Sequence, residues 1–252
     1  MEEIIMINQN YDKLLQLKLD KMAELYLAQS NKKKYTELGF DERLAILVDA
    51  EMEDKRNKAI EAMRRSAAIR IPQANINDLE FFPDRGINKN QTLQLHECDY
   101  IQEKLNVIVV GATGAGKTYY VSALANSAIE KGIRTKYIRL SDLLYELSVT
   151  RDTPKTFKRK LRNLSKVELL IIDDWLLTDL NEEQQSDVFE LLELRNEEHS
   201  TVLASQFNVS GWHEKLGSGA IADAIMDRII HNSYIITIEG SKSMRERNSK
   251  IR

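Results

Sequence analysis

One octapeptide restricts the possible folds of this 252-residue chain more than any other feature. Residues 111–118 read GATGAGKT and match the pattern G-x-x-x-x-G-K-[ST] without a mismatch. A strand-like run, Asn106–Val110, precedes them, and a helical pattern follows. Glycines let the backbone N–H groups of such a loop turn inward toward phosphate oxygens, and the following helix adds its positive N-terminal end. The sequence therefore predicts a phosphate-binding loop between a buried strand and a helix.

The side chains that close this loop indicate a phosphate ligand with a magnesium ion. The Lys117 ammonium is a mobile cation suited to the β- and γ-phosphates, and the Thr118 hydroxyl is a suitable Mg²⁺ ligand. The residues expected to bind the nucleotide are Gly111, Ala112, Thr113, Gly114, Ala115, Gly116, Lys117, Thr118 and Tyr119.

A pair of acids supplies the second carboxylate that such a site needs. Asp173 and Asp174 directly follow the apolar run Leu169–Ile172. A carboxylate in that position is costly unless it is paired or coordinated. We therefore expect Asp173 to ligate the magnesium ion and Asp174 to orient or deprotonate the attacking water. The alternative is two exposed acids at the end of a strand.

Two further residues are catalytic candidates, each with a plain structural alternative. Gln206 ends the strand-like stretch TVLASQF and is placed to reach a γ-phosphate or a water beside Asp173, or it is a satisfied polar residue at a strand end. Arg228, in an amphipathic helical stretch, is suited to stabilise charge on a transferred phosphoryl group, in its own subunit or a neighbouring one. Its alternative is a surface pairing with Asp227.

The periodicity of the chain indicates two regions. From residue 106 onward, strand-like runs alternate with helical ones, which is typical of an α/β fold with a parallel sheet covered on both faces. The strands are expected at 106–110, 135–138, 167–172, 201–204 and 234–238, and the helices at 118–131, 141–147, 181–197 and 220–229.

The region before the sheet is predicted to be helical. Residues 1–70 contain no proline and one glycine, and predict a helix over 11–29, a break at 30–34 and a second helix from an N-cap at Asp41 to about 65. Pro72, Pro83 and Gly86 mark a connector of turns and short pieces at 71–105. We therefore expect a helical domain at 1–70 and a nucleotide-binding domain at 71–252.

Composition limits the class of protein and the cellular compartment that we expect. The chain has 42% apolar and 30% charged residues, which argues against disorder, and its apolar runs are too short to cross a bilayer. The N-terminus lacks a secretory signal pattern, the single Cys98 has no partner for an internal disulfide, and no Cys/His cluster has metal-ligand spacing. These observations predict a cytoplasmic protein without a membrane partner or a structural metal.

Charge is sorted into blocks although the net charge is only −3. Between Arg151 and Arg162 there are six bases and one acid, Asp152. Such a block suits DNA phosphates without reading bases, or it is a solvated face. The basic end, residues 242–252, is a second candidate for DNA binding. The residues of the first block that we expect to bind DNA are Lys155, Lys158, Arg159, Lys160 and Arg162.

Taken together, these motifs resemble a known family. GATGAGKT, LLIIDDW, TVLASQF and the combination of DAIMDRIIHNSY with GSKSMR are similar to those of IstB-type transposition helper ATPases, which are AAA+ proteins related to the DnaC helicase loaders. The resemblance implies an AAA+ core with a five-stranded parallel sheet and a small helical N-terminal domain for partner binding and oligomer contacts. It also implies ATP and Mg²⁺ as cofactors, self-association on duplex DNA, and delivery of that DNA to a transposase.

The resemblance also implies roles for individual residues. Lys117, Thr118 and Asp173 would hold Mg-ATP, while Asp174 stands where many AAA+ relatives have Glu. Gln206 falls at a sensor position, and Arg228 at the arginine finger that acts on the next subunit. Arg245 is the implied nucleotide-sensing arginine.

Two alternatives remain at this stage. One is a DnaC-like loader that binds a helicase and single-stranded DNA. The other is a small-molecule kinase with the same loop, which would need neither an arginine from a neighbour nor a basic DNA track.

Overall fold

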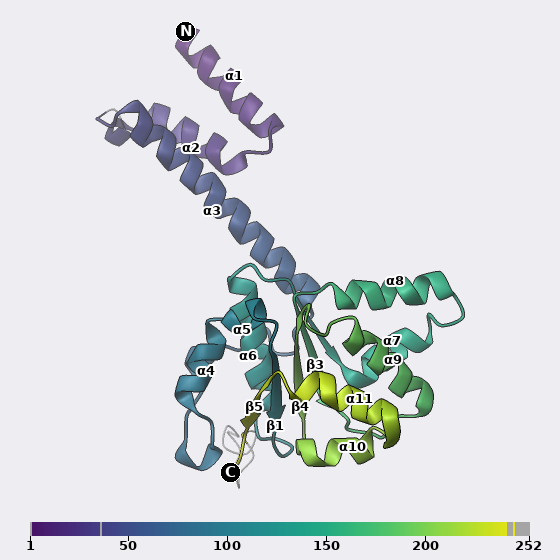
Figure 1. The fold of residues 1–252 in the computed structure, drawn as a ribbon. Helices are drawn as coiled ribbons and strands as arrows, with labels where there is room; N and C mark the ends of the chain where they lie inside the picture. The colour runs from purple at the N-terminus through teal and green to yellow at the C-terminus, as the bar shows by residue number, and fades with distance from the viewer. Residues whose placement is uncertain (1, 36, 241–243, 245–252) are drawn as a thin grey trace, which may run out of the picture. The chain divides into compact units, whose positions relative to one another are not determined.

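The structure, a computed structural model, describes residues 2–35, 37–240 and 244 (Figure 1). The chain divides into two compact units, residues 1–62 and 63–252. This division lies inside a long helix, α3 (Phe40–Ala67), and so precedes the connector at which the sequence placed a domain boundary. None of the helices in the described part of the chain is both long enough and apolar enough to span a bilayer.

The first unit has one helix more than the sequence predicts. In place of a helix over 11–29, α1 (Glu2–Gln16) ends before α2 (Asp20–Asn31) begins. Lys18 adopts a left-handed φ of 58°, and the Leu19 N–H returns to the Leu14 carbonyl at 2.9 Å. No glycine or proline marks this turn. Tertiary structure supports it, because the buried Glu51 carboxylate of α3 accepts the Met22 N–H at 2.9 Å in the first turn of α2.

The boundary between α2 and α3 also differs in detail from the expectation. A 3₁₀ turn, η1 (Lys33–Tyr35), follows α2, and α3 already begins at Phe40. Asp41, the expected N-cap, therefore lies within the first turn of α3, where the Glu42 carboxylate accepts the Gly39 N–H at 2.8 Å. The favourable interaction of these acids with the helix N-terminus explains the start of α3.

The second unit contains the predicted parallel sheet. Its order is β2-β3-β4-β1-β5, and every paired neighbour runs parallel (Figure 1). The strand positions predicted from the apolar runs are confirmed to within a few residues at each end. Their bounds are β1 (Asn106–Val110), β2 (Thr135–Arg139), β3 (Leu169–Trp175), β4 (Ser200–Ser205) and β5 (Ser233–Thr237).

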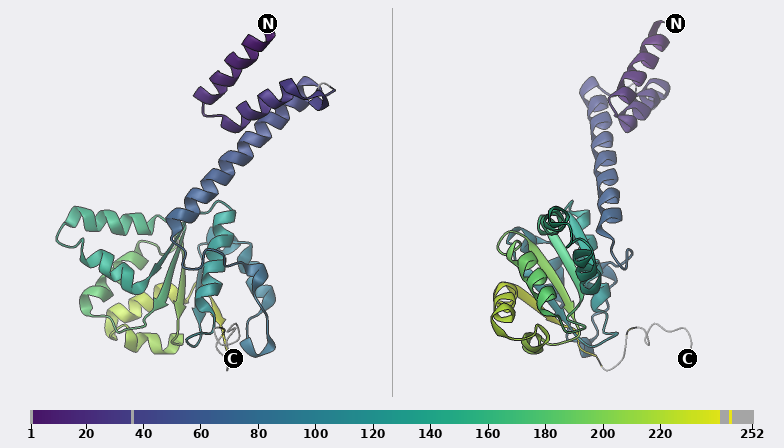
Figure 2. Two further views of the ribbon diagram at one scale, coloured as in Figure 1. Left: turned by 180° about the vertical axis from the view of Figure 1, so that it is seen from behind. Right: turned by 90° about the vertical axis from the view of Figure 1, so that its right-hand side faces the viewer.

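Helices cover both faces of this sheet (Figures 1 and 2). On one face lies α6 (Lys117–Glu130), which is buried along most of its length. On the other face, apolar residues of the sheet pack with α7 (Leu140–Ser148), α8 (Pro154–Ser165), α9 (Glu182–Glu193) and α11 (Gly219–Ile230). Trp175 and Trp212 meet edge-to-face within this core, with ring centroids 5.8 Å apart.

The remaining elements are short. The connector expected to consist of turns holds two helices, α4 (Lys89–His96) and α5 (Asp99–Gln102), and the 3₁₀ turns η2 (Ile76–Asp78) and η3 (Pro83–Arg85). After β4 come η4 (Val209–Gly211) and α10 (Trp212–Lys215). Asn88 caps α4 by accepting the Gln91 N–H at 3.1 Å, a local signal that the turn-rich composition obscured.

Candidate nucleotide-binding site

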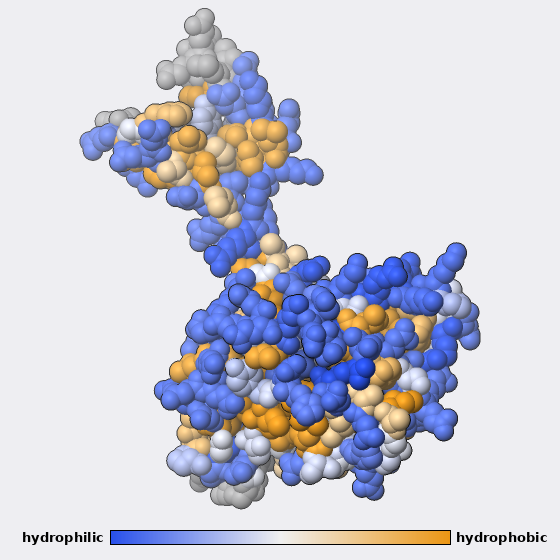
Figure 3. Space-filling view, in the orientation of Figure 1, coloured by the Kyte–Doolittle hydropathy of each residue, from blue (hydrophilic) through white to orange (hydrophobic). Residues whose placement is uncertain are grey.

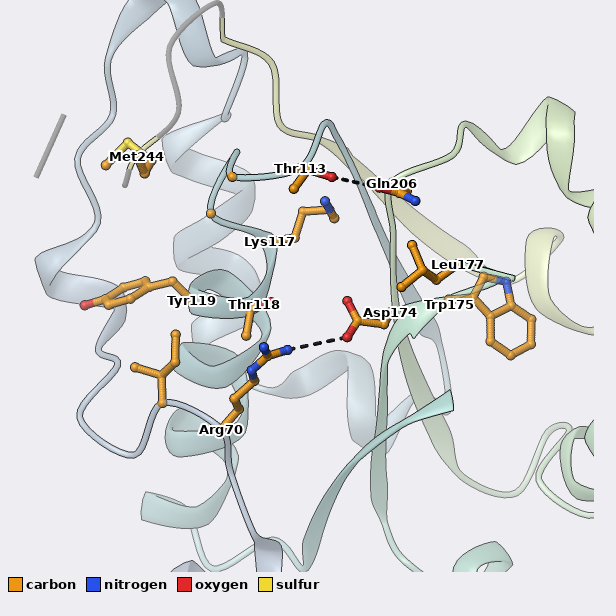
Figure 4. A pocket seen from close by; sticks show the side chains of 13 residues that line it. Arg70, Thr113, Lys117, Thr118, Tyr119, Asp174, Trp175, Leu177, Gln206 and Met244 are labelled. Carbon is orange, nitrogen blue, oxygen red and sulfur yellow. Dashed lines mark hydrogen bonds and ion pairs between the residues drawn. The ribbon is translucent and has the colours of Figure 1, made fainter. Parts of the chain in front are cut away.

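A cavity of about 510 Å³ lies at the carboxyl ends of β1, β3 and β4 (Figure 4). In open parallel sheets this edge is where ligands bind. Many residues expected at the site line the cavity, namely Thr113, Gly114, Gly116, Lys117, Thr118, Tyr119, Asp174 and Gln206. Residues that sequence reasoning did not assign to the site also line it, namely Arg70, Ile71, Trp175, Leu177 and Met244.

Two glycines of the loop have no room for a side chain. A Cβ on Gly111 would lie 2.3 Å from the Ile238 carbonyl oxygen, just past β5. Gly116, at the N-cap of α6, has a φ of 96°, and a Cβ there would lie 2.9 Å from the Arg85 guanidinium. The loop therefore packs tightly against its surroundings and leads directly into α6, whose first N–H groups have no carbonyl partner within the helix.

The loop is braced by an arginine that the sequence did not single out. Arg85, in η3, is buried, and its Nη2 donates to the Ala115 carbonyl at 2.5 Å. The Arg85 carbonyl accepts the Glu239 N–H at 2.8 Å, which ties the same turn to the chain after β5. The turn-rich connector thus supports the phosphate loop through Arg85. In the sequence, nothing except a basic residue between Pro83 and Gly86 pointed to this role of Arg85.

Lys117 is held over the loop in a partly desolvated position. Its Nζ donates to the Gly111 carbonyl at 2.6 Å and to the Ala112 carbonyl at 3.0 Å. Burial lowers the pKa of Lys117, and the negative charges of Asp173 and Asp174 oppose that shift. An anion that enters the cavity would stabilise the charged form of Lys117, because it replaces the water that the ammonium has lost through burial.

The expected magnesium ligands lie together. Asp173 is buried at the end of β3, and its Oδ2 accepts the Thr118 hydroxyl at 2.8 Å. The same oxygen accepts the hydroxyl of Tyr137, from β2, at 2.5 Å, and Oδ1 accepts the Asp174 N–H at 2.8 Å. Burial and the bond to Asp173 raise the pKa of Tyr137. The hydroxyl and carboxylate oxygens beside a phosphate loop suit Mg²⁺, which prefers oxygen ligands.

The strand changes course between the two acids. Pairing of β3 with β4 shifts between Ile172 and Trp175, and Asp174 has a left-handed φ of 54°. This irregularity buries Asp173 against α6 while leaving the Asp174 side chain 37% exposed in the cavity. The two neighbouring acids therefore differ in environment, which the repeat of Asp in the sequence does not reveal.

Asp174 faces a cation that the sequence did not predict at the site. Arg70 reaches across the cavity, with Nη1 3.4 Å from Asp174 Oδ2 and 3.9 Å from Asp173 Oδ2 (Figure 4). Arg70 and Tyr137 come from segments far from the two motifs, and no spacing in the sequence connects them to the acids.

Gln206 also reaches the loop. Its Oε1 accepts the Thr113 hydroxyl at 2.8 Å, so the residue after β4 lies beside the phosphate loop and at the cavity (Figure 4). The amide has a hydrogen-bond partner and also a position from which it can meet a ligand. Both interpretations of Gln206 are compatible with this geometry.

Arg228 lies elsewhere. It is absent from the lining of the cavity in the described part of the chain, and its Nε pairs with Glu193 of α9. Its guanidinium carbon lies 4.8 Å from the centroid of the Phe189 ring. The suggested pairing with Asp227 is wrong, because Arg228 points toward α9 while Asp227 pairs with His231, one turn along α11. Arg245 and the bases of residues 242–252 lie outside the described residues.

The basic block between Arg151 and Arg162 forms α8 and the turn before it. Leu161 and Leu164 are buried, whereas four of the five expected DNA-binding residues are exposed: Lys155, Lys158, Arg159 and Arg162. At 100° per residue these four and Lys166 share one side of the helix axis. The surface over α8 is mostly hydrophilic in Figure 3. We call these five residues the basic face.

Two bases of the block are engaged elsewhere. Lys160 pairs with Glu146 of α7. Arg151 pairs with Glu183 and Asp187 of α9 and lies 5.1 Å from the Phe157 ring centroid. These contacts attach α8 to its neighbours, so the expectation that Lys160 belongs with the DNA-facing set is not supported by its placement. A helical wheel separates Lys160 from the basic face, and that signal was available in the sequence.

A buried arginine anchors the end of α8. Arg195 donates from Nη1 to the carbonyls of Leu164 at 2.8 Å and Ser165 at 3.1 Å in the last turn of the helix, and to that of Val167 at 2.7 Å. Its burial lowers its pKa to about 9. Because the Leu164 and Ser165 carbonyls lie in the last turn, where they have no partner within the helix, Arg195 satisfies them, and its bond to Val167 links the end of α8 to the segment before β3.

Comparisons with known proteins agree with this site. Residues 12–251 match the family described as IstB-like ATP binding protein. The chain is 32% identical over 239 residues to the insertion sequence ATP-binding protein y4pL of Sinorhizobium fredii, covering 95% of this chain and 97% of that relative. It is 33% identical over 202 residues to the insertion sequence IS1162 ATP-binding protein of Pseudomonas fluorescens, covering 80% and 87%.

Solved structures share the fold of the second unit. The DnaC helicase loader aligns with a TM-score of 0.56 at 19% identity, over 66% of this chain and 97% of that one. DnaI aligns with a TM-score of 0.55 at 22% identity, over 66% and 91%. AMPPCP-bound DnaA from Aquifex aeolicus aligns with a TM-score of 0.56 at 21% identity, over 69% and 52%. At these identities the similarity establishes a shared fold alone.

Proposed function

This chain belongs to the family of IstB-like ATP binding proteins, and we propose that it is a Mg²⁺-dependent ATPase that assembles on duplex DNA and delivers it to a partner transposase. The observation that carries the ATPase proposal is the 2.8 Å hydrogen bond between Thr118, at the end of the phosphate loop, and Asp173, at the end of β3. It joins the two expected magnesium ligands beside a cavity large enough for a nucleotide: Thr118 lines that cavity, and Asp173 is buried next to it.

Each residue has a distinct part in the proposed reaction. Loop N–H groups and Lys117 bind the β- and γ-phosphates, and Thr118 and Asp173 hold the metal. A magnesium ion in this position neutralises charge on the phosphate oxygens. Asp174 accepts a proton from the attacking water or orients it, and Gln206 positions the γ-phosphate or that water from the opposite side.

The proposal assigns Arg228 to a neighbouring subunit. In the described part of the chain, no residue of α11 lines the cavity, and this separation favours action of Arg228 on a phosphate held by another chain. This requires the chain to self-associate with nucleotide, and we assign the helical unit 1–62 to contacts with partners and other subunits. Residues 63–70 of the expected helical domain belong to the nucleotide-binding unit, where Arg70 lines the cavity. Arg228→Ala should leave nucleotide binding by isolated subunits intact and slow turnover by the assembly. Normal turnover in that variant would remove the role.

The basic face supports the proposal of DNA binding. In the described part of the chain, no ion pair joins Lys155, Lys158, Arg159, Arg162 or Lys166 to a protein acid, so their charges remain available to phosphates. Contacts of this kind are independent of base sequence. The insertion-sequence names of the relatives favour duplex target DNA and a transposase over a helicase partner.

The deciding experiment is nucleotide-dependent assembly on DNA. The wild-type chain is mixed with non-hydrolysable ATP analogue and Mg²⁺, and its mass is measured on duplex and on single-stranded DNA of equal length. We expect larger assemblies on the duplex, only with nucleotide. Preference for the single strand would favour a loader of the DnaC type, and absence of any nucleotide-dependent assembly would remove the helper function.

A further inference from the structure

Arg70 occupies the cavity through a backbone turn that follows α3. Ala68, the residue after the helix, has a left-handed φ of 55°, which is costly for any residue with a side chain. The next residue, Ile69, is buried, and the guanidinium of Arg70 then extends toward the end of β3 (Figure 4). A strained turn followed by a buried anchor indicates that the position of Arg70 is imposed by the surrounding fold.

The guanidinium lies where positive charge is most favourable. Asp173 and Asp174 are adjacent carboxylates, and Arg70 Nη1 lies 3.9 Å and 3.4 Å from one oxygen of each. Among the described residues that line the cavity, Lys117 is the other base; it donates to the carbonyls of Gly111 and Ala112 in the loop, and both acids also act on its charge. Arg70 therefore contributes, from the side of the acids, part of the positive charge that balances the pair.

The same carboxylate oxygen would also serve the metal. Asp173 Oδ2 accepts the hydroxyl of Thr118, the other expected metal ligand, and the same oxygen lies 3.9 Å from Arg70 Nη1. A divalent ion at Thr118 and Asp173 would therefore lie close to the guanidinium. Because like charges at this separation repel, the two cations cannot both keep their best positions.

We propose that Arg70 is a positioning residue that competes with the divalent cation for Asp173 and Asp174. Before nucleotide binds, Arg70 neutralises the acids and ties the segment that follows α3 to the end of β3. The arriving metal displaces the guanidinium, which frees Asp174 for its role with water and releases residues 68–71 from the acids. This inference rests on the proposed function, since it assumes that the cavity takes a nucleotide with its metal.

The test measures metal binding directly. Mn²⁺ replaces Mg²⁺ because free and bound Mn²⁺ are distinguished by electron paramagnetic resonance, and AMPPCP is present at saturation so that hydrolysis plays no part. Arg70→Gln is compared with wild type. The matched control is Arg134→Gln, which removes an arginine paired with Glu168 that does not line the cavity. We expect Arg70→Gln to reach half-saturation at a Mn²⁺ concentration about threefold to tenfold lower, and the control to match wild type.

Hydrogen exchange of the backbone gives a second readout. In wild type, Mn²⁺ with AMPPCP should accelerate exchange at residues 68–71, whereas in Arg70→Gln these residues should exchange rapidly before ligand is added. An unchanged or higher Mn²⁺ midpoint in Arg70→Gln overturns the competition, and a higher midpoint with weaker AMPPCP binding indicates that Arg70 contacts phosphate instead. If wild type itself binds neither AMPPCP nor Mn²⁺, the proposed ATPase function fails and this inference falls with it.

Discussion

The cavity and the basic face are both proposed to bind phosphate, but their charged groups are held in different ways. In the cavity, charged groups are buried or braced, and each has named partners: Asp173 with Thr118 and Tyr137, and Lys117 with the loop carbonyls. On the basic face the charges are exposed, and within the described part of the chain none of them forms an ion pair with a protein acid. Fixed geometry is required to stabilise one reacting phosphate, whereas a row of mobile charges suffices to neutralise a polymer. Single substitutions should therefore matter in the cavity, and only combined ones on α8.

The strongest test of this contrast removes the cation of the loop. Lys117→Ala should weaken Mg-ATP binding by roughly 100-fold or more, because a partly desolvated ammonium in direct contact with phosphate has no substitute. Isothermal titration calorimetry measures the change. Lys131→Ala is the matched control, since Lys131 lies just after the other end of α6 and pairs with Glu97. Equal affinity in the two variants would contradict the assignment of the loop.

Asp174→Asn separates binding from chemistry at the same site. We expect ATP to bind with little change while hydrolysis slows by about 100-fold, because the amide cannot accept the proton of the attacking water. Release of inorganic phosphate in single-turnover experiments is the measurement. An amide retains the size of the side chain, so an undiminished rate would assign the role of Asp174 to another group.

DNA binding by the basic face should depend on how many basic residues are replaced more than on which ones. Replacing Lys158, Arg159 and Arg162 by Ala should weaken duplex binding for all sequences alike and lower the slope of log affinity against log salt by about 3. Lys160→Ala is the control, because Lys160 pairs with Glu146 on the other side of α8. A triple variant with the wild-type salt slope would exclude α8 as the DNA contact.

The smallest effect is expected on replacing Tyr137, whose hydroxyl donates a hydrogen bond to Asp173 of the acid pair. Tyr137→Phe removes the hydrogen bond to Asp173 and should cost about 1 kcal/mol of stability at neutral pH. The raised pKa of Tyr137 means that the folded chain keeps a proton which the unfolded chain loses above its ordinary value of 10.0. Stability is therefore lost as pH rises above that value, and the loss should be shallower in Tyr137→Phe.

Chemical denaturation of both proteins between pH 8 and about 11 measures this difference. Tyr100 and Tyr120 also have raised pKa values caused by burial and contribute to the decline in both proteins. The difference between the two curves therefore isolates Tyr137, and parallel curves would show that its hydroxyl does not stabilise the fold through Asp173.

Local sequence patterns were sufficient to predict most of the fold. Strands that are buried on both faces read as continuous apolar runs, so β1 and its neighbours could be located from hydropathy, and the glycine loop identified the edge at which the ligand site lies. The break at Lys18 and the helix α4 were not foreseen. Each depends on a hydrogen bond or a dihedral angle that many sequences can adopt, and in the case of Lys18 on a carboxylate from α3.

The amino-acid sequence alone determined the phosphate loop, the acid at the end of β3 and the alternation that makes a parallel sheet, because these depend on neighbours within a few residues. Only the tertiary structure decided that Arg70 faces Asp174, that Tyr137 supports Asp173, that Arg85 braces the loop and that Arg228 pairs with Glu193. Those contacts join residues between 30 and 104 positions apart. The sheet brings such distant side chains together through long-range packing, which leaves no periodicity in the chain that a reader of the sequence could detect.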